Sequence, residues 1–338
     1  MNELGLIDAF LEPFQLTRYA RRSGAGVLSG PGDDCAVVRP SRGHELVLKV
    51  DELVQGVHFD PRWFAPEDVG HKALAAALSD LAAAGARPRW FLCALGVRTD
   101  SDPVPVVRGM ARGMAALARR HRCALVGGNV TKAGAWSISV TALGEAARPR
   151  TRSGARPGHA LVIAGDLGRA ALGLRLLPRD GNGGGGERAW REGEASARRT
   201  REESAAISAQ LRPEPLVAAG LAATGLAAAA VDVSDGFLRD LGHLCEASGC
   251  GAEVDVDDLP IDAAVRATDI ELALSGGEDY ALLFAARPQS ASRLVAALNK
   301  TRTPARVAGR FVKGRGIRLS QGGSPRALPP RLGWDHLE

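Results

Sequence analysis

Carboxylate side chains stand beside glycine or other small residues at five places in the sequence, a grouping that could serve metal-assisted chemistry. The segments are Gly32-Asp33-Asp34-Cys35-Ala36, Val50-Asp51, Ser79-Asp80, Asp232-Val233-Ser234-Asp235-Gly236 and Ser275-Gly276-Gly277-Glu278-Asp279-Tyr280. Each place alone also has a structural explanation. Asp235 could cap a helix that begins at Phe237, and the Gly-Asp-Asp sequence could form a turn.

Two of these aspartates are difficult to explain by structure alone. Asp80 lies near the carboxyl end of an alanine-rich helical run, where a negative charge opposes the helix dipole. Asp232 follows the apolar run at 227–231. A carboxylate in such surroundings is costly unless a cation or a hydrogen-bond donor meets it. Both positions therefore point to a ligand.

The chemistry that fits a set of converging carboxylates is magnesium binding. Carboxylates brought together repel one another unless cations lie between them, and Mg²⁺ takes oxygen ligands that it shares with substrate phosphates. No histidine or cysteine accompanies the aspartates in a zinc-like pattern. The residues therefore predict an enzyme that uses ATP and Mg²⁺ and transfers or exploits a phosphoryl group.

The elements that must position these residues are short strands alternating with longer helices, which predicts an α/β or α+β fold. Strands are expected at 45–51, 89–97, 123–126, 136–144, 160–164, 227–233 and 281–284, and helices at 66–85, 104–121, from 169 onward and at 237–247. The period of two in the first strand places Val47, Lys49 and Asp51 on one face. The proline-containing segment 146–158 predicts a junction between an amino-terminal domain over 1–147 and a carboxyl-terminal domain over 148–338.

A run of glycines, Gly181-Asn182-Gly183-Gly184-Gly185-Gly186, opens a charged stretch that extends to about Glu203. No Lys-Ser or Lys-Thr pair follows these glycines, so the run lacks the pattern of a phosphate-binding P-loop. We expect residues 181–203 to form a flexible surface loop.

Composition narrows the function classes. The 338 residues are 45% hydrophobic and 24% charged, which fits two globular domains. The net charge is +5, but only 4% of residues are aromatic and no basic stripe with stacking residues appears, so no nucleic-acid partner is expected. The five cysteines form no Cys-x-x-Cys pair, which favours buried thiols in a reducing compartment. The sequence also lacks a signal-peptide pattern and a long apolar run, and we expect a cytoplasmic protein without membrane contact.

The carboxylate segments, taken in order with two others, resemble the thiamine-monophosphate kinase family. The matching segments are GDDCA (32–36), DELVQGVHF (51–59), KALAAALSDLAAAG (72–85), TRSGA (151–155), DVSDG (232–236), SGGEDY (275–280) and GWDH (333–336). The resemblance implies the two-domain fold of aminoimidazole-ribonucleotide synthetase and selenophosphate synthetase, with an amino-terminal domain that dimerises through its sheet and a carboxyl-terminal α+β domain that completes the cleft. It also implies direct transfer of the γ-phosphoryl group of ATP to thiamine monophosphate.

The same resemblance implies roles for individual residues. Magnesium ions would be held by Asp34, Asp51, Asp80, Asp232 and Asp235, the first four of them catalytic. ATP would contact Gly128, Asn129, Arg152 and Ser234, and the thiamine would lie among His58, Glu278 and Trp334. A glutamate can accept from an aminopyrimidine, an indole can cover a cationic ring, and a histidine can donate to a phosphate. Without the resemblance, a surface histidine, a turn glutamate and a packing tryptophan would be the favoured interpretations.

The chain departs from the family pattern at positions that the resemblance places near the metals and the nucleotide. Lys49 and Val50 replace a small hydroxyl residue and a threonine, and Asn129 and His159 each replace an aspartate. In one interpretation the Lys49 ammonium neutralises Asp51 and substitutes for one magnesium ion. In another the site has changed, either to phosphorylate a carboxyl or amide oxygen, which Asn129 favours, or to bind nucleotide without turnover as a dimeric protein. The retained aspartates and thiamine-side residues favour the kinase.

Overall fold

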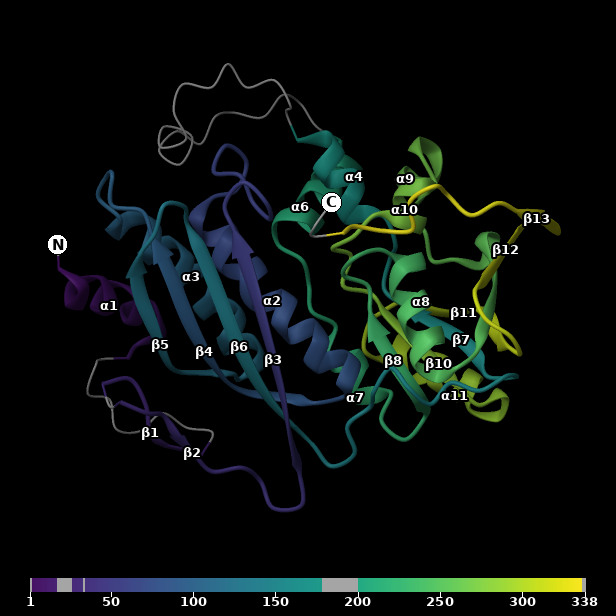
Figure 1. Cartoon of the computed structure of the whole chain (residues 1–338), viewed down its shortest axis with the longest axis horizontal. Helices are drawn as coiled ribbons and strands as arrows, with labels where there is room; N and C mark the ends of the chain where they lie inside the picture. Colours follow the sequence, from purple (N-terminus) through teal and green to yellow (C-terminus); the bar gives the residue numbers. More distant parts are fainter. Residues whose placement is uncertain (1, 17–25, 33, 178–199, 336–338) are drawn as a thin grey trace. The chain divides into compact units, whose positions relative to one another are not determined.

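The computed structural model describes residues 2–16, 26–32, 34–177 and 200–335. They divide into two compact units (Figure 1). The first contains residues 2–16, 26–32, 34–78, 88–147 and 177, and the second contains 79–87, 148–176 and 200–335. The second unit therefore includes the end of helix α2 (Pro66–Ala84), which carries Ser79 and Asp80.

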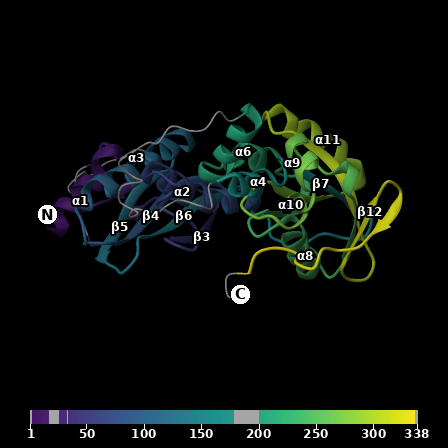
Figure 2. The ribbon, with the colours of Figure 1, turned by 90° about the horizontal axis from the view of Figure 1, so that it is seen from above.

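The first unit is built on a four-stranded sheet in the order β3-β6-β4-β5. The strands are β3 (Glu45–Val54), β4 (Arg87–Val97), β5 (Ala124–Lys132) and β6 (Ser137–Ala146). Helices α2 and α3 (Val104–His121) cover one face of this sheet in both views (Figures 1 and 2). The unit also holds α1 (Glu3–Leu11), the short helix η1 (Glu12–Phe14) and the antiparallel pair β1 (Val27–Ser29) and β2 (Val37–Val38). Its core is the apolar face of α2 and α3, with Leu74, Leu78 and Met110 fully buried.

The second unit is built on a seven-stranded sheet in the order β13-β12-β9-β11-β7-β10-β8. The strands are β7 (Ala160–Ala164), β8 (Ala227–Asp232), β9 (Gly251–Asp255), β10 (Leu282–Ala286), β11 (Ala305–Val312), β12 (Ile317–Gln321) and β13 (Ser324–Arg326). The helices are α4 (Arg169–Leu176), α6 (Arg201–Leu211), α7 (Val217–Ala222), α8 (Phe237–Ser248), η2 (Val256–Asp258), α9 (Ala263–Thr268), α10 (Glu271–Ser275) and α11 (Pro288–Lys300).

The central strand β10 is buried along its whole length because helices cover both faces of the sheet. Helix α8 lies on one side and α11 on the other (Figure 2). Side chains alternate accordingly: Leu283 and Ala285 belong to the core cluster that includes Leu241 and Leu244 of α8. This packing fixes the strand ends from which the candidate site residues extend.

The predicted mixed helix and strand fold is confirmed, and the helix predicted at 104–121 and the strand at 160–164 have the observed ends. The predicted loop at 181–203 is wrong at its end. Thr200 caps α6, and its side chain and that of Glu203 each accept a backbone N–H in a reciprocal capping box. The rest of that segment, 181–199, lies outside the described residues. No helix within the described ranges is long and apolar enough to cross a membrane.

Candidate active site

Three segments that are far apart in sequence meet in the second unit: residues 232–236 after β8, 275–280 before β10, and the carboxyl-terminal residues 333–335. The backbone N–H of Tyr280 donates to Val233 O (2.8 Å) and that of Glu278 donates to Ser234 O (2.7 Å). The N–H of Trp334 donates to Asp235 O (2.8 Å). Main-chain hydrogen bonds therefore bring together Ser234, Asp235, Glu278 and Trp334, as the resemblance implied.

The segment that carries Glu278 has a strained backbone. Glu278 and Tyr280 have φ of 66° and 50°, in the left-handed region that residues other than glycine rarely adopt. Gly277 packs so closely that a Cβ there would lie 2.5 Å from Ser234 O. Strain of this kind persists only where the surroundings impose the conformation, and it is common at ligand sites.

Asp232 lies at the end of β8 and is 3% exposed. Its Oδ2 accepts a hydrogen bond from Ser79 Oγ at 2.7 Å, and Ser79 is completely buried in α2. Ser79 directly precedes Asp80, so this bond ties the two predicted metal-ligating segments to each other. The cost of burying Asp232, which the sequence indicated, is offset in part by this hydroxyl donor.

The end of α2 is held by Arg150, a residue that no sequence pattern indicated. Its guanidinium donates to Ala83 O (3.1 Å), Ala82 O (3.2 Å) and Gly220 O (2.6 Å). The backbone N–H of Arg150 also donates to Ala84 O at 2.9 Å. Burial lowers the pKa of Arg150 to about 10, so it remains charged at neutral pH. A cation at the carbonyl end of the helix is favourable and secures the turn that carries Asp80.

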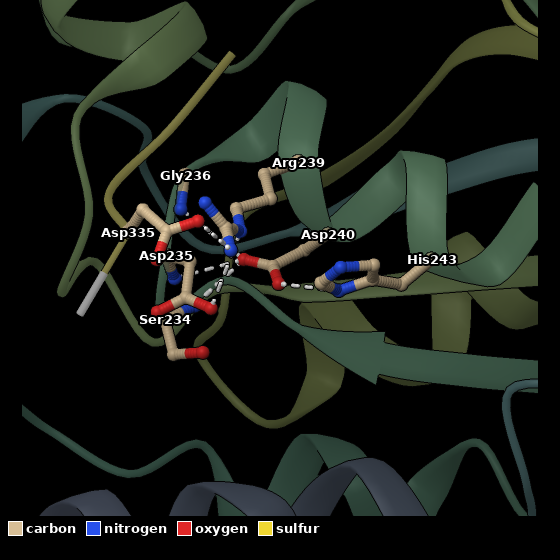
Figure 3. Close-up of polar contacts among 7 residues, drawn as sticks. All are labelled: Ser234, Asp235, Gly236, Arg239, Asp240, His243 and Asp335. Carbon is tan, nitrogen blue, oxygen red and sulfur yellow. Dashed lines mark hydrogen bonds and ion pairs between the residues drawn. The ribbon is translucent and has the colours of Figure 1, made fainter. Parts of the chain in front are cut away.

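Asp235 is followed by a charged cluster at the start of α8 (Figure 3). Arg239 Nη2 lies 3.1 Å from Asp335 Oδ2, and Arg239 Nε lies 3.8 Å from Asp235 Oδ2. Asp240 is 1% exposed, and its Oδ2 accepts the backbone N–H groups of Ser234 (3.0 Å), Asp235 (3.0 Å) and Gly236 (3.2 Å). The idea that Asp235 caps this helix is wrong, because Gly236 is the N-cap and no side chain makes a cap hydrogen bond.

Glu278 and Trp334 are the predicted thiamine contacts of this unit. Glu278 Oε2 accepts from Gln210 Nε2 at 2.6 Å, and Glu278 lines a cavity of about 300 Å³ together with Arg169 and Arg212. Trp334 is 50% exposed.

Asp279, next to Glu278, has a structural role. Its two carboxylate oxygens accept the N–H groups of Gly168 (2.6 Å) and Ala170 (3.0 Å) at the start of α4. Burial raises the pKa of Asp279 to about 7, and these two N–H donors act in the opposite direction.

In the first unit, Lys49 and Asp51 lie on the same face of β3, as the period of two predicted. Lys49 Nζ is 3.2 Å from Asp51 Oδ1, and both side chains are half-buried. On the neighbouring strand β6 they stand opposite Ala142 and Val140, which are fully buried. Val50 points to the other face and is 60% exposed.

The other predicted residues of this unit lie on different elements. Asp34 is exposed and precedes β2, and Gly128 and Asn129 are exposed on β5. A Cβ at Gly128 would lie 1.9 Å from Cys93 O, so this position tolerates only glycine. His58 follows β3, where its Nδ1 accepts the N–H of Val54 at 3.1 Å. That bond leaves the Nε2 nitrogen as the proton-bearing donor of a neutral ring.

Asp51 and Asn129 do not lie together within one copy of the sheet. They are on β3 and β5, the two edge strands of the sheet. Three strand spacings of about 4.8 Å lie between these strands, so the strands are about 14 Å apart. Lys49, which is also on β3, and Asn129 therefore lie apart within one chain.

His159 also lies away from the expected place. It precedes Ala160, which pairs with Ala286, whereas Asp232 pairs with Leu282 at the other end of β10. Four residues of strand separate these ends by about 13 Å. His159 instead belongs to a buried turn in which its carbonyl accepts the N–H of Phe311. Its replacement of an aspartate therefore leaves the strand ends that carry Asp232 unaffected.

Arg152, the predicted ATP contact, has an exposed side chain, and its carbonyl accepts from Ser248 Oγ at 3.0 Å. The predicted metal ligands are divided between the units: Asp34 and Asp51 in the first, and Asp80, Asp232 and Asp235 in the second. Within the described ranges, no group of three or more histidine, cysteine, aspartate or glutamate side chains is close enough to hold an ion by itself.

Comparison with known proteins identifies the family. The models of the AIR synthase related protein match residues 32–146 with the N-terminal domain and 156–321 with the C-terminal domain. The thiamine-monophosphate kinase of Salmonella typhimurium is 35% identical over 336 residues, covering 95% of this chain and 97% of that protein. This chain belongs to the thiamine-monophosphate kinase family. The Mycobacterium tuberculosis member is 37% identical over 294 residues, with 84% and 80% covered.

Solved structures agree with this membership in the thiamine-monophosphate kinase family. The enzyme from Stenotrophomonas maltophilia K279a is 35% identical with a TM-score of 0.78, covering 96% of this chain and 98% of that one. AaThiL complexed with AMPPCP and TMP is 29% identical with a TM-score of 0.73, covering 98% and 96%. A hydrogenase maturation protein HypE in complex with ATP, at 19% identity and a TM-score of 0.72, shares the fold.

Proposed function

We propose that this protein phosphorylates thiamine monophosphate with ATP and forms thiamine diphosphate. The observation that carries the proposal is the convergence of residues 232–236, 275–280 and 333–335 in a chain whose relative over nearly its full length is a thiamine-monophosphate kinase. A homologue has been solved with AMPPCP and TMP, an ATP analogue and the acceptor. The retained site residues of this chain fit the same pair of ligands.

Magnesium fits the residues present. The candidate donors are all carboxylates, the hard oxygen ligands that Mg²⁺ prefers, and the buried carboxylate of Asp232 accepts from Ser79, the residue before Asp80. Asp34, Asp51, Asp80, Asp232 and Asp235 would hold the ions, which would neutralise charge on the triphosphate.

The remaining steps belong to the side chains of the protein. The acceptor is a phosphate that is already ionised at neutral pH, so transfer needs positioning and charge neutralisation and no strong general base. Glu278 would accept from the aminopyrimidine, the exposed face of Trp334 would cover the thiazolium, and the Nε2–H of His58 would donate to the phosphate. Gly128, Asn129, Arg152 and Ser234 would contact ATP.

We further propose that the working form is a homodimer assembled through the four-stranded sheet. The outer face of edge strand β3 exposes Leu46, Leu48 and Val50 at 40%, 64% and 60%. A row of exposed aliphatic side chains on an edge strand is typical of a surface that another protein covers. A second copy also suits the placement of Asp51 and Asn129 on opposite edges. Light scattering should give twice the 35.3 kDa mass of one chain, and a monomer mass would overturn this point.

The two domains would have different roles. We assign residues 1–147 to dimerisation and to ATP and metal binding, and 148–338 to completion of the substrate cleft. The cytoplasm, where ATP is available, is the compartment we propose. The five free cysteines agree with a reducing environment, since burial raises the pKa of Cys93, Cys123 and Cys245 and keeps these thiols unreactive.

The direct test is incubation of the purified protein with ATP, Mg²⁺ and thiamine monophosphate, followed by chromatography for thiamine diphosphate. Product should form in proportion to enzyme and fall about 1000-fold in Asp80→Asn, since one charge-stabilising group contributes on that order. Asp258→Asn, an exposed carboxylate of η2, is the matched control and should retain full activity.

The alternatives would give different results. ATP consumption without thiamine diphosphate would favour a different acceptor, such as the carboxyl or amide oxygen that Asn129 makes plausible. ATP binding measured by calorimetry without any turnover would favour a nucleotide-binding dimer.

A further inference from the structure

Three consecutive peptide units at the end of β8 are held from both sides. Their N–H groups, those of Ser234, Asp235 and Gly236, all point to one oxygen of Asp240, at 3.0, 3.0 and 3.2 Å (Figure 3). Asp240 lies in the first turn of α8 and is 1% exposed. Convergent N–H groups at a helix start form an anion site of the kind that binds phosphate in many proteins. Here an internal carboxylate fills it.

The carbonyl groups of the same three peptide units point to the other two segments of the site. Val233 O accepts from the N–H of Tyr280, Ser234 O from that of Glu278, and Asp235 O from that of Trp334, at 2.8, 2.7 and 2.8 Å. Each peptide unit thus joins Asp240 on one side to a different residue on the other: Tyr280, Glu278 or Trp334. Rotation of any of these peptide planes would break a bond at both ends.

We propose that Asp240 is the positioning residue of the active site. Its carboxylate fixes the three peptide planes, and through them sets the main chain of Glu278 and Trp334 relative to Asp232 and Asp235. It also occupies the anion site at the start of α8, so phosphate cannot bind there directly. The inference rests on the proposed function only for the names of the ligands.

The charge of Asp240 matters as well as its shape. Three N–H donors to one oxygen make charge-assisted hydrogen bonds, which are stronger than bonds to a neutral acceptor. The carboxylate also offsets the positive end of the α8 dipole.

The test compares Asp240→Asn with Glu246→Gln, an exposed glutamate of the same helix that makes the same change in charge. Hydrogen exchange followed by mass spectrometry should show exchange about 10- to 100-fold faster in residues 233–236, 278–280 and 332–335 of Asp240→Asn, because hydrogen bonds to a charged acceptor are lost. Glu246→Gln should match the wild type in all three segments. Faster exchange confined to 233–236 would overturn the proposal.

A second measurement distinguishes a positioning role of Asp240 from a general effect on protein stability. Asp240→Asn should raise the KM for thiamine monophosphate and the Mg²⁺ concentration for half-maximal rate together, each about 10-fold or more. Asp240→Glu, which keeps the charge, should recover part of both and serves as the test variant if the asparagine form does not fold. A lower unfolding temperature with unchanged kinetic constants would show a merely structural residue. The exchange experiment needs no acceptor, so it remains decisive even if the protein makes no thiamine diphosphate.

Discussion

The two units present their candidate residues in different ways. In the first, Lys49 and Asp51 lie on β3 and Gly128 and Asn129 on β5, so the sheet ladder fixes each backbone position. In the second, Asp235, Glu278 and Trp334 lie on irregular segments whose main chain is fixed by hydrogen bonds to other loops and to Asp240. Regular strands place residues by local alternation, whereas the loops depend on partners distant in sequence. The loop region should therefore be far more sensitive to single substitutions away from the ligands.

The largest expected effect is at Arg150, which holds the end of α2. Arg150→Met keeps the length of the side chain but leaves the carbonyls of Ala82, Ala83 and Gly220 without their cationic donor. We expect the free energy of unfolding to fall by about 3 kcal/mol, because three carbonyl groups lose hydrogen bonds from a charged donor. Urea unfolding would measure it.

Arg148→Met, at an exposed position two residues earlier, is the control and should change stability by less than about 0.5 kcal/mol. Equal stability of the two variants would mean that the hydrogen bonds of Arg150 do not stabilise the end of α2.

A smaller effect is expected from Asp279, whose pKa is raised to about 7 in the folded state from 3.8. Between these values the folded protein holds one more proton than the unfolded chain, so stability falls as pH rises through that window. Because of Asp279, the free energy of unfolding should fall by about 1 kcal/mol for each pH unit between pH 5 and 7. Urea unfolding of the wild type and Asp279→Asn across pH 4–8 would measure it. The asparagine variant should lack this part of the slope, and identical slopes would contradict the assignment.

The smallest effect is expected in the first unit, where Lys49 lies 3.2 Å from Asp51. If the ammonium substitutes for one magnesium ion, Lys49→Ser should raise the Mg²⁺ concentration for half-maximal rate about 5-fold, equivalent to roughly 1 kcal/mol for a part-exposed ion pair. Counting bound Mn²⁺ by electron paramagnetic resonance with a non-hydrolysable ATP analogue should show one additional ion. An unchanged number of bound Mn²⁺ ions and an unchanged magnesium dependence would contradict the idea that Lys49 substitutes for a metal ion.

The same contrast explains what the sequence could reveal. The face shared by Lys49 and Asp51 was predictable because strand alternation is a local property. The burial of Asp232 was indicated by the apolar run before it. Asp240 and Arg150 were missed because their partners are backbone groups, which leave no mark on side-chain identity. Thr200 and Glu203 did carry a capping-box signal, at the spacing that starts α6, and the adjacent glycine run obscured it.

The places of His159 and Asn129 depend on topology. Strand order and register put His159 about 13 Å from the end of β10 that pairs with Asp232, and put Asn129 about 14 Å from the strand that carries Asp51. Spacing along a chain does not determine which end of a strand, or which edge of a sheet, a residue reaches.

The way in which Asp240 holds the segment after β8 has a consequence for how this enzyme can change over evolutionary time. The backbone at Ser234 and Asp235 is secured through peptide groups, so the conformation does not depend on which side chains stand there. A substitution at either position would change the proposed contact with ATP or with a cation without rebuilding the loop. Asp240 and the closely packed Gly277 form the part that such substitutions must leave unchanged.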